Sequence, residues 1–156
     1  MNGQGRSYTQ LPRLYAVTDE SLTPDATLVA QVRTVLAAGV RLVQVRFKTS
    51  PPGRRLQLGR ALRALTREHG ALLVVNDHPS LARQIGADGV HLGESDPDVE
   101  TARQMLGPEA LVGVSVYDRM DRVRSFAGSE VDYFGASSPY TSPLKRTKAV
   151  PGTGEF

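Results

Sequence analysis

Gln44, Arg46 and Lys48 stand at alternate positions in a segment that begins with the β-branched run 40–43. Successive side chains of a strand point to opposite faces, so a strand over residues 42–47 would turn all three polar groups the same way. A guanidinium offers phosphate oxygens a two-pronged hydrogen-bonding fork, an ammonium adds a point charge, and an amide adds a donor. The spacing therefore favours a phosphate site, although a solvated face of an amphipathic edge strand would show the same pattern.

Two carboxylates follow the next two predicted strands. Asn76 and Asp77 come directly after the apolar run 72–75, and Asp96 lies in the loop after the run 89–92. Neighbouring parallel strands lie roughly 4.8 Å apart, so the two loops can converge on one ion. Two carboxylates with phosphate oxygens and water suit Mg²⁺. Taken singly, each aspartate is also well explained as a turn or helix-capping residue, because each precedes a proline.

Other predicted strands also end in polar residues. His91 closes an apolar strand and is typical of a buried, hydrogen-bonded side chain, whereas Ser115 follows the run 111–114. A later segment rich in serine, threonine and proline ends in Lys145. Its hydroxyls, with Lys145, could hold a phosphate group, or the segment could be an ordinary surface loop.

The elements that must position these residues alternate strictly between helix and strand. Five glycines come after helix-like stretches and before β-like ones, where helices commonly end. Because the strands are nearly continuous apolar runs, they suit a parallel sheet covered on both faces. The expected helices are 26–38, 53–69, 79–85, 98–106 and 118–127, the expected strands are 14–18, 42–47, 72–75, 89–92, 111–114 and 131–136, and the glycines are Gly39, Gly70, Gly86, Gly107 and Gly128.

This α/β pattern allows an open doubly wound sheet or a TIM (β/α) barrel. In an open sheet the ligand groups gather at one switch point. Here almost every predicted strand ends in a candidate ligand, which is the arrangement around the carboxyl-end rim of a barrel. We therefore expect a barrel with about six βα strands, as a single domain over residues 1–156 with a flexible tail at residues 1–11.

Composition excludes several classes of protein. The net charge of +3 is modest and the arginines are spread along helical stretches without aromatic partners, so nucleic-acid binding is not expected. The chain has no cysteine, which suits a cytoplasmic protein. No apolar run is long enough to cross a membrane, so a membrane partner is not expected either.

As an ordered set, these motifs resemble the thiamine-phosphate synthase family, which includes the related thiazole tautomerases. The likeness runs from about Leu14 to Lys145. It is carried by Leu14-Tyr15-Ala16-Val17-Thr18-Asp19, by Gln44-x-Arg46-x-Lys48, by Asn76-Asp77, by Gly86-Ala87-Asp88-Gly89-Val90-His91-Leu92-Gly93 with Asp96, by Gly113-Val114-Ser115, and by Asp132-Tyr133-x-Gly135.

The resemblance implies a TIM barrel that joins a hydroxymethylpyrimidine diphosphate to a thiazole phosphate and releases diphosphate with Mg²⁺. It implies metal binding by Asp77 and Asp96, and a dissociative reaction in which diphosphate leaves before the thiazole nitrogen attacks. The implied catalytic residues are Arg46, Lys48, Ser115 and Lys145, and the implied substrate-binding residues are Gln44, Arg46, Lys48, Asn76, Ser115, Ser142 and Lys145.

The chain also departs from the family pattern. Glu94 stands where glutamine is usual, Ser137-Ser138 replaces a typical Gly-Pro, and Leu144 replaces one of two threonines, the other matching Ser142. The sequence ends after six predicted strands, so we expect the last two βα units, with the acceptor half of the site, to be missing. The exposed edges of such a barrel would favour association into a homo-oligomer. The alternatives are a thiazole tautomerase-like isomerase and a non-catalytic remnant that binds a phosphate ligand.

Overall fold

The computed structural model describes residues 10–136, in which helices and strands alternate. The strands are β1 (Ala16–Val17), β2 (Leu42–Val45), β3 (Leu72–Asn76), β4 (Gly89–Leu92), β5 (Leu111–Tyr117) and β6 (Tyr133–Ala136). The helices are α1 (Asp25–Ala37), α2 (Pro52–Glu68), α3 (Pro79–Ile85), α4 (Val99–Leu106) and α5 (Met120–Ser125). Most of the expected tail, and the segment with Ser142 and Lys145, lie outside the described residues.

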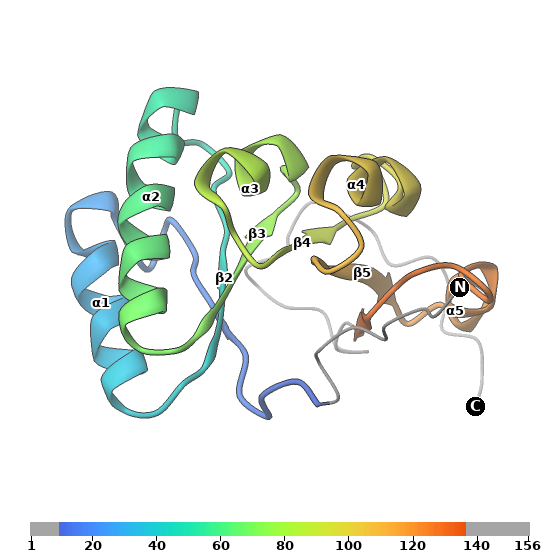
Figure 1. Cartoon of the computed structure of the whole chain (residues 1–156), viewed down its shortest axis with the longest axis horizontal. Helices are drawn as coiled ribbons and strands as arrows, with labels where there is room; N and C mark the ends of the chain where they lie inside the picture. Colours follow the sequence, from blue (N-terminus) through green and yellow to red (C-terminus); the bar gives the residue numbers. More distant parts are fainter. Residues whose placement is uncertain (1–9, 137–156) are drawn as a thin grey trace.

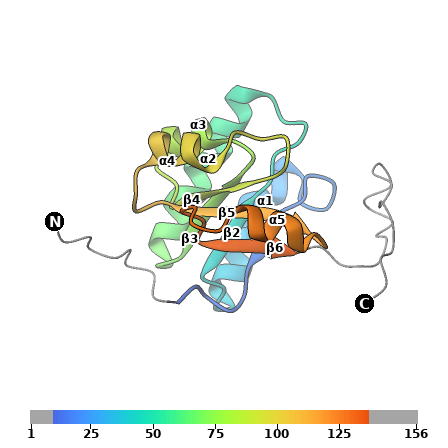
Figure 2. The ribbon, with the colours of Figure 1, turned by 90° about the vertical axis from the view of Figure 1, so that its right-hand side faces the viewer.

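The six strands form one parallel sheet whose spatial order is the order of the chain. A doubly wound sheet would reverse its strand order at a switch point, and this sheet does not. Figure 1 shows the helices following the outer side of the curved sheet from α1 to α5, and the turned view in Figure 2 shows α2, α3 and α4 on the same side of it. The predicted α/β fold is therefore confirmed as a curled half-barrel.

Apolar side chains fill the layer between the sheet and its helices. Val43, Val45 and Phe47 are almost fully buried in one cluster with Leu36 of α1 and Leu62 of α2. Burying such a side chain contributes about 1.5–3 kcal/mol relative to leaving it exposed. The alternation of these residues with Gln44, Arg46 and Lys48 fixes which side of the segment meets the helices.

The concave side of the sheet is closed at the amino end of the strands. Leu42, Val74 and Leu111 form a second buried cluster there, and Leu11 and Tyr15 pack against it. This apolar floor lies below the polar carboxyl ends of the same strands.

Two aspartates tie the amino edge of the sheet to its helices. Asp88 accepts a hydrogen bond of 2.7 Å from the backbone N–H of Leu73 in β3 and two more, of 2.5 and 2.9 Å, from Arg63 of α2. Asp132 accepts one of 2.7 Å from a backbone N–H of β5 and is paired with Arg103 of α4 at 2.5 Å. Each aspartate–arginine clamp thus joins two strands and a helix.

The expected elements are all present in residues 10–136, with shifted ends. Strand β2 ends at Val45 rather than at residue 47, because the backbone N–H of Arg46 donates to the hydroxyl of Thr18 at 3.0 Å. Strand β5 continues past residue 114 to Tyr117, with a register irregularity between Ser115 and Tyr117. The prediction for the five punctuating glycines is confirmed, since each has a positive φ, and Gly86 is the left-handed C-cap of α3.

Candidate functional site

An ammonium and two carboxylates meet in the loops after β2, β3 and β4. Lys48 donates from Nζ to Oδ2 of Asp77, and the carboxyl groups of Asp77 and Asp96 are close enough for each to change the pKa of the other. Asp96 also accepts a hydrogen bond of 2.6 Å from the backbone N–H of Gly93. The convergence expected from the sequence for these three residues is present.

Asp77 has an unusual backbone conformation. Its φ is +64°, in the left-handed region, and its N–H donates to the carbonyl of His91 at 2.8 Å. Aspartate tolerates this region better than most residues because its short side chain can bond locally. Such conformations collect at functional sites, where surrounding contacts hold them in place.

The two carboxylates ionise differently. Burial alone would raise the pKa of Asp77, but the hydrogen bond and charge of Lys48 outweigh it and the pKa is lowered. Burial raises the pKa of Asp96, and the neighbouring Asp77 carboxylate raises it further. A cation beside both groups would relieve this repulsion.

The donor set fits a hard cation that keeps part of its water shell. Among residues 10–136 no group of three or more histidine, cysteine, aspartate or glutamate side chains gathers as a metal cage. Two carboxylates are what Mg²⁺ commonly takes from a protein when phosphate and water complete its octahedron. Asp77 and Asp96 are therefore the pair that could hold Mg²⁺.

Arg46 pairs with Asp19, which follows β1, and not with Asp77, the partner of Lys48. Its Nη1 is 3.3 Å from Oδ2 of Asp19, and both side chains are more than a third exposed. Hydrogen bonds from Ser21 are the main reason that the pKa of Asp19 is lowered, with the charge of Arg46 adding to it. Arg46 is thus paired but accessible, so an incoming phosphate could replace the carboxylate.

Glu20, which the sequence patterns did not single out, holds the Lys48 loop. Its carboxylate accepts hydrogen bonds from the backbone N–H groups of Lys48, Thr49 and Ser50 at 2.6–3.0 Å, and from the hydroxyl of Thr49 at 2.9 Å and that of Ser50 at 2.5 Å. Burial works against ionisation, but the bonds from Ser50, Thr49 and Lys48 outweigh it and lower the pKa of Glu20 to about 2. The only sequence signal is an acidic residue after one strand and a hydroxyl pair after the next.

Asn76 offers an unused donor. Its side chain is 6% exposed, and its Nδ2 has no hydrogen-bond partner among the described residues. Leaving a buried donor unsatisfied costs about 1–3 kcal/mol. An oxygen atom of a ligand at the carboxyl edge would remove that cost.

Neutral side chains form a hydrogen-bonded chain on the concave side of the sheet. Gln44, which stays a predicted substrate contact, donates to the hydroxyl of Tyr15 at 2.8 Å, and the hydroxyls of Tyr15 and Tyr133 are 2.7 Å apart. His91 is 3.2 Å from Tyr133 through Nδ1 and 2.8 Å from Oγ of Ser115 through Nε2. His91 is thus the buried, hydrogen-bonded residue that its pattern indicated, and burial lowers its pKa.

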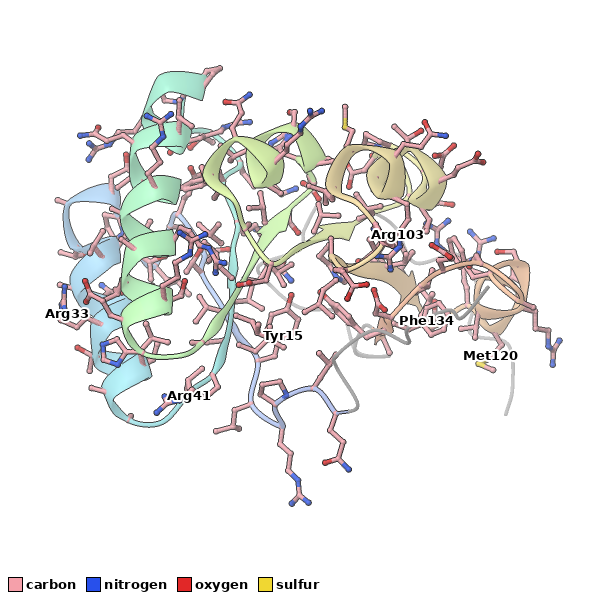
Figure 3. The ribbon with its side chains drawn as sticks, viewed as in Figure 1. Tyr15, Arg33, Arg41, Arg103, Met120 and Phe134 are labelled. Carbon is pink, nitrogen blue, oxygen red and sulfur yellow. The ribbon has the colours of Figure 1, made fainter. Side chains whose placement is uncertain are left out.

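Sequence patterns named Tyr15 and Tyr133 only as parts of motifs. The geometry gives them partners across the sheet, with ring centroids 5.7 Å apart in an edge-to-face arrangement. Figure 3 places Tyr15 on the concave side, away from the helices. No periodicity could have paired two residues at opposite edges of the sheet.

Comparisons with known proteins show which family this chain resembles. The family described as "Thiamine monophosphate synthase" matches residues 14–156. The chain is 44% identical over 136 residues to the thiamine-phosphate synthase of Thioalkalivibrio sulfidiphilus, covering 87% of this chain and 64% of the relative. It is 47% identical over 128 residues to that of Chromobacterium violaceum, covering 81% and 61%.

A solved structure shares the fold as well as the sequence. The thiamine phosphate pyrophosphorylase of Pyrococcus furiosus superposes with a TM-score of 0.72 at 36% identity, covering 81% of this chain and 60% of that one. The chain thus spans about three fifths of the length of the relatives it matches. On the family match and these identities, the chain belongs to the thiamine monophosphate synthase family.

Proposed function

We propose that this chain takes part in thiamine biosynthesis as a synthase-type transferase. The proposed reaction joins a hydroxymethylpyrimidine diphosphate to a thiazole phosphate: the bond from the pyrimidine methylene carbon to diphosphate oxygen breaks, and a bond from that carbon to the thiazole nitrogen forms. Diphosphate leaves with the bonding electron pair. The observation that carries the proposal is the meeting of Lys48, Asp77 and Asp96 at one edge of the sheet, next in sequence to Asn76, whose Nδ2 has no hydrogen-bond partner within residues 10–136.

The roles follow from charge. The departing diphosphate gains negative charge, so the reaction speeds up where donors and cations already face the place where that charge develops. Lys48 and Arg46 would bind its oxygens, and Asn76 would donate through Nδ2. Lys145 and Ser142, outside the described residues, remain proposed contacts by family resemblance.

Asp77 and Asp96 would hold Mg²⁺. When bound, the ion would neutralise charge on the leaving diphosphate. Lys48 would then be released from Asp77 to the diphosphate, which the partial exposure of its side chain allows.

Calorimetry tests this proposal directly. The pyrimidine diphosphate should bind in the presence of MgCl₂, and Asp77→Asn should abolish the metal-dependent part of that binding. Equal binding in EDTA would contradict the synthase proposal and favour an isomerase of the tautomerase kind. Metal-dependent binding without turnover of the thiazole phosphate would favour a phosphate-binding remnant.

Location and assembly complete the proposal. No helix in the described part of the chain is long and apolar enough to cross a membrane, and the substrates would be soluble phosphorylated precursors, so we place the protein in the cytoplasm. Leu14, Val17 and Phe134, at the outer strands β1 and β6, are exposed apolar residues. They favour a homo-oligomer, which sedimentation analysis of the purified chain would detect.

A further inference from the structure

The hydrogen-bonded chain on the concave side reaches from Gln44 to Ser115. In order, it links Gln44, Tyr15, Tyr133, His91 and Ser115 through contacts of 2.7–3.2 Å. Gln44 and His91 are buried, whereas the other three side chains are partly buried. The two tyrosines come from opposite edges of the sheet, so the chain crosses the inside of the half-barrel.

Starting from the amide donor of Gln44, one direction of hydrogen bonds uses each hydroxyl of the network both as an acceptor and as a donor. The Nε2 group of Gln44 can only donate, so the hydroxyl of Tyr15 accepts from it. In this direction the O–H of Tyr15 donates a hydrogen bond to Tyr133. Tyr133 then donates to Nδ1 of His91. In this direction the imidazole is neutral, carries its proton on Nε2, and donates to Oγ of Ser115.

Ser115 thus accepts from the chain and keeps its own proton for another partner. Its Oγ is also next to the register irregularity of β5, a type of distortion that re-aims side chains near active sites. In this direction Ser115 accepts from His91, and its own O–H is left to donate to a ligand bound at the carboxyl edge.

Two glycines make room for the rings in this chain. A Cβ at Gly113 would lie 2.1 Å from Cζ of Tyr133, and a Cβ at Gly135 would lie 2.9 Å from Cε1 of His91. Side chains at these positions would displace the rings. The backbone is therefore fitted to this arrangement of Tyr133 and His91.

We infer that Tyr15, Tyr133 and His91 are positioning residues. The two tyrosines hold His91 as the Nε2–H tautomer, and His91 in turn leaves the hydroxyl proton of Ser115 for an acceptor atom of the ligand. This inference rests on the proposed function, because it assigns the ligand to the same site. The acceptor is an oxygen of the diphosphate or a ring nitrogen of the pyrimidine, since both chemistries accept one hydrogen bond.

Nuclear magnetic resonance of ¹⁵N-histidine-labelled protein tests the direction of these hydrogen bonds without any ligand. The signals of His91 are identified in a His69→Gln/His78→Gln variant, which retains only that histidine. We expect a protonated Nε2 and an unprotonated Nδ1 at neutral pH. A protonated Nδ1 in the unmodified chain would overturn the inference.

Variants along the hydrogen-bonded network from Gln44 to Ser115 sharpen the same measurement. Tyr133→Phe removes the donor to Nδ1, so the preference for the Nε2–H tautomer should be lost. Gln44→Glu replaces the terminal donor with an acceptor, so the direction should reverse and the proton should move to Nδ1. An unchanged tautomer in both variants would overturn the inference. Should Tyr133→Phe fail to fold, Tyr15→Phe interrupts the chain one bond earlier and should weaken the same preference.

Steric variants give an independent control. Gly113→Ala should press on the ring of Tyr133 and change the signals of His91. Gly53→Ala is the matched control, because no atom lies within 4 Å of the added Cβ. Equal His91 signals in Gly113→Ala and in the unmodified chain would count against a fitted ring.

Binding arms then separate the two ligand sources and the two proposals. Inorganic diphosphate with MgCl₂ and unphosphorylated hydroxymethylpyrimidine are titrated into Tyr133→Phe and the unmodified chain. Loss of one oriented hydrogen bond should weaken the ligand that Ser115 contacts by about threefold to tenfold, and an unchanged affinity for both would overturn the positioning role. Failure of the unmodified protein to bind either ligand would overturn the proposed function. The tautomer of His91 would still decide the direction of the hydrogen bonds.

Discussion

The two edges of the sheet use ion pairs differently. At the amino edge the side chain of Arg103 is 8% exposed and that of its partner Asp132 is 13% exposed, and the arginine also donates to backbone carbonyls. At the carboxyl edge the side chain of Lys48 is 44% exposed and forms its ion pair with Asp77. Buried pairs bonded to backbone hold the structure together, whereas partly exposed pairs can exchange a partner for a ligand. This division matches the general separation of stability and activity between the two faces of a barrel.

The largest expected effect breaks the amino edge. Arg103→Met would leave the buried Asp132 without its arginine, and removing one member of a buried pair costs about 3–5 kcal/mol. Denaturant unfolding measures this loss. Arg33→Met is the matched control, since Arg33 is 57% exposed in its pair with Glu68, and its free energy of unfolding should change by less than about 0.5 kcal/mol. Similar losses in both variants would contradict the contrast.

The second prediction breaks the carboxyl edge without unfolding the protein. Lys48→Met should weaken binding of diphosphate with MgCl₂ by about tenfold to a hundredfold, because hydrogen bonds to charged groups contribute roughly 1.5–3 kcal/mol. The unfolding free energy should fall by less than about 1 kcal/mol, since the pair is partly exposed. Calorimetry and unfolding on one preparation measure both. A large loss of stability with intact binding would reverse the assignment of this edge.

The third prediction concerns the loop that carries Lys48. The pKa of Glu20 is lowered from 4.5 to about 2, so the folded state binds its proton more weakly than the unfolded state does. Its contribution to stability is therefore complete above about pH 4.5 and is lost as the pH falls toward 2. Glu20→Gln should reduce stability at pH 7 by about 1–3 kcal/mol and flatten this acid dependence. Unfolding curves between these pH values measure the slope, with the exposed Glu100→Gln as the control that should retain it.

The smallest effect is expected at Glu94, for which the sequence resemblance implies a departure from glutamine. Its carboxylate is 3.1 Å from Arg119 and 3.8 Å from Arg122, so its negative charge is already compensated at the surface. Glu94→Gln should strengthen binding of diphosphate by no more than about threefold. A larger gain in calorimetry would show that Glu94 opposes the ligand despite its arginine partners.

Periodicity predicted the elements of this fold well because burial sets both the strand and the helix patterns. The alternation through Val45 and Phe47 placed Lys48 on the correct side, and the order of loops brought Asp77 and Asp96 together. The predicted end of β2 was wrong, because the backbone N–H of Arg46 donates to the side-chain hydroxyl of Thr18 and not to a strand carbonyl.

Long-range neutral contacts could not be predicted in the same way. The bond from Gln44 to Tyr15 was not predicted, and neither was that from Tyr15 to Tyr133, which lies 118 residues along the chain. That contact depends on the curvature of the whole sheet, which no local pattern encodes. Glu20 was missed because its partners are mainly backbone N–H groups, which have no sequence signature.

The amino-edge clamps carry one more consequence. The aspartate, the strand N–H and the helix arginine that tie β3 to β4 recur in the same order between β5 and β6. Each clamp lies within one αβαβ module, α2 to β4 or α4 to β6, because its arginine comes from the helix before the first strand. Growth or shuffling by whole modules would leave existing fastenings intact, whereas a cut inside a module would separate an aspartate from its arginine.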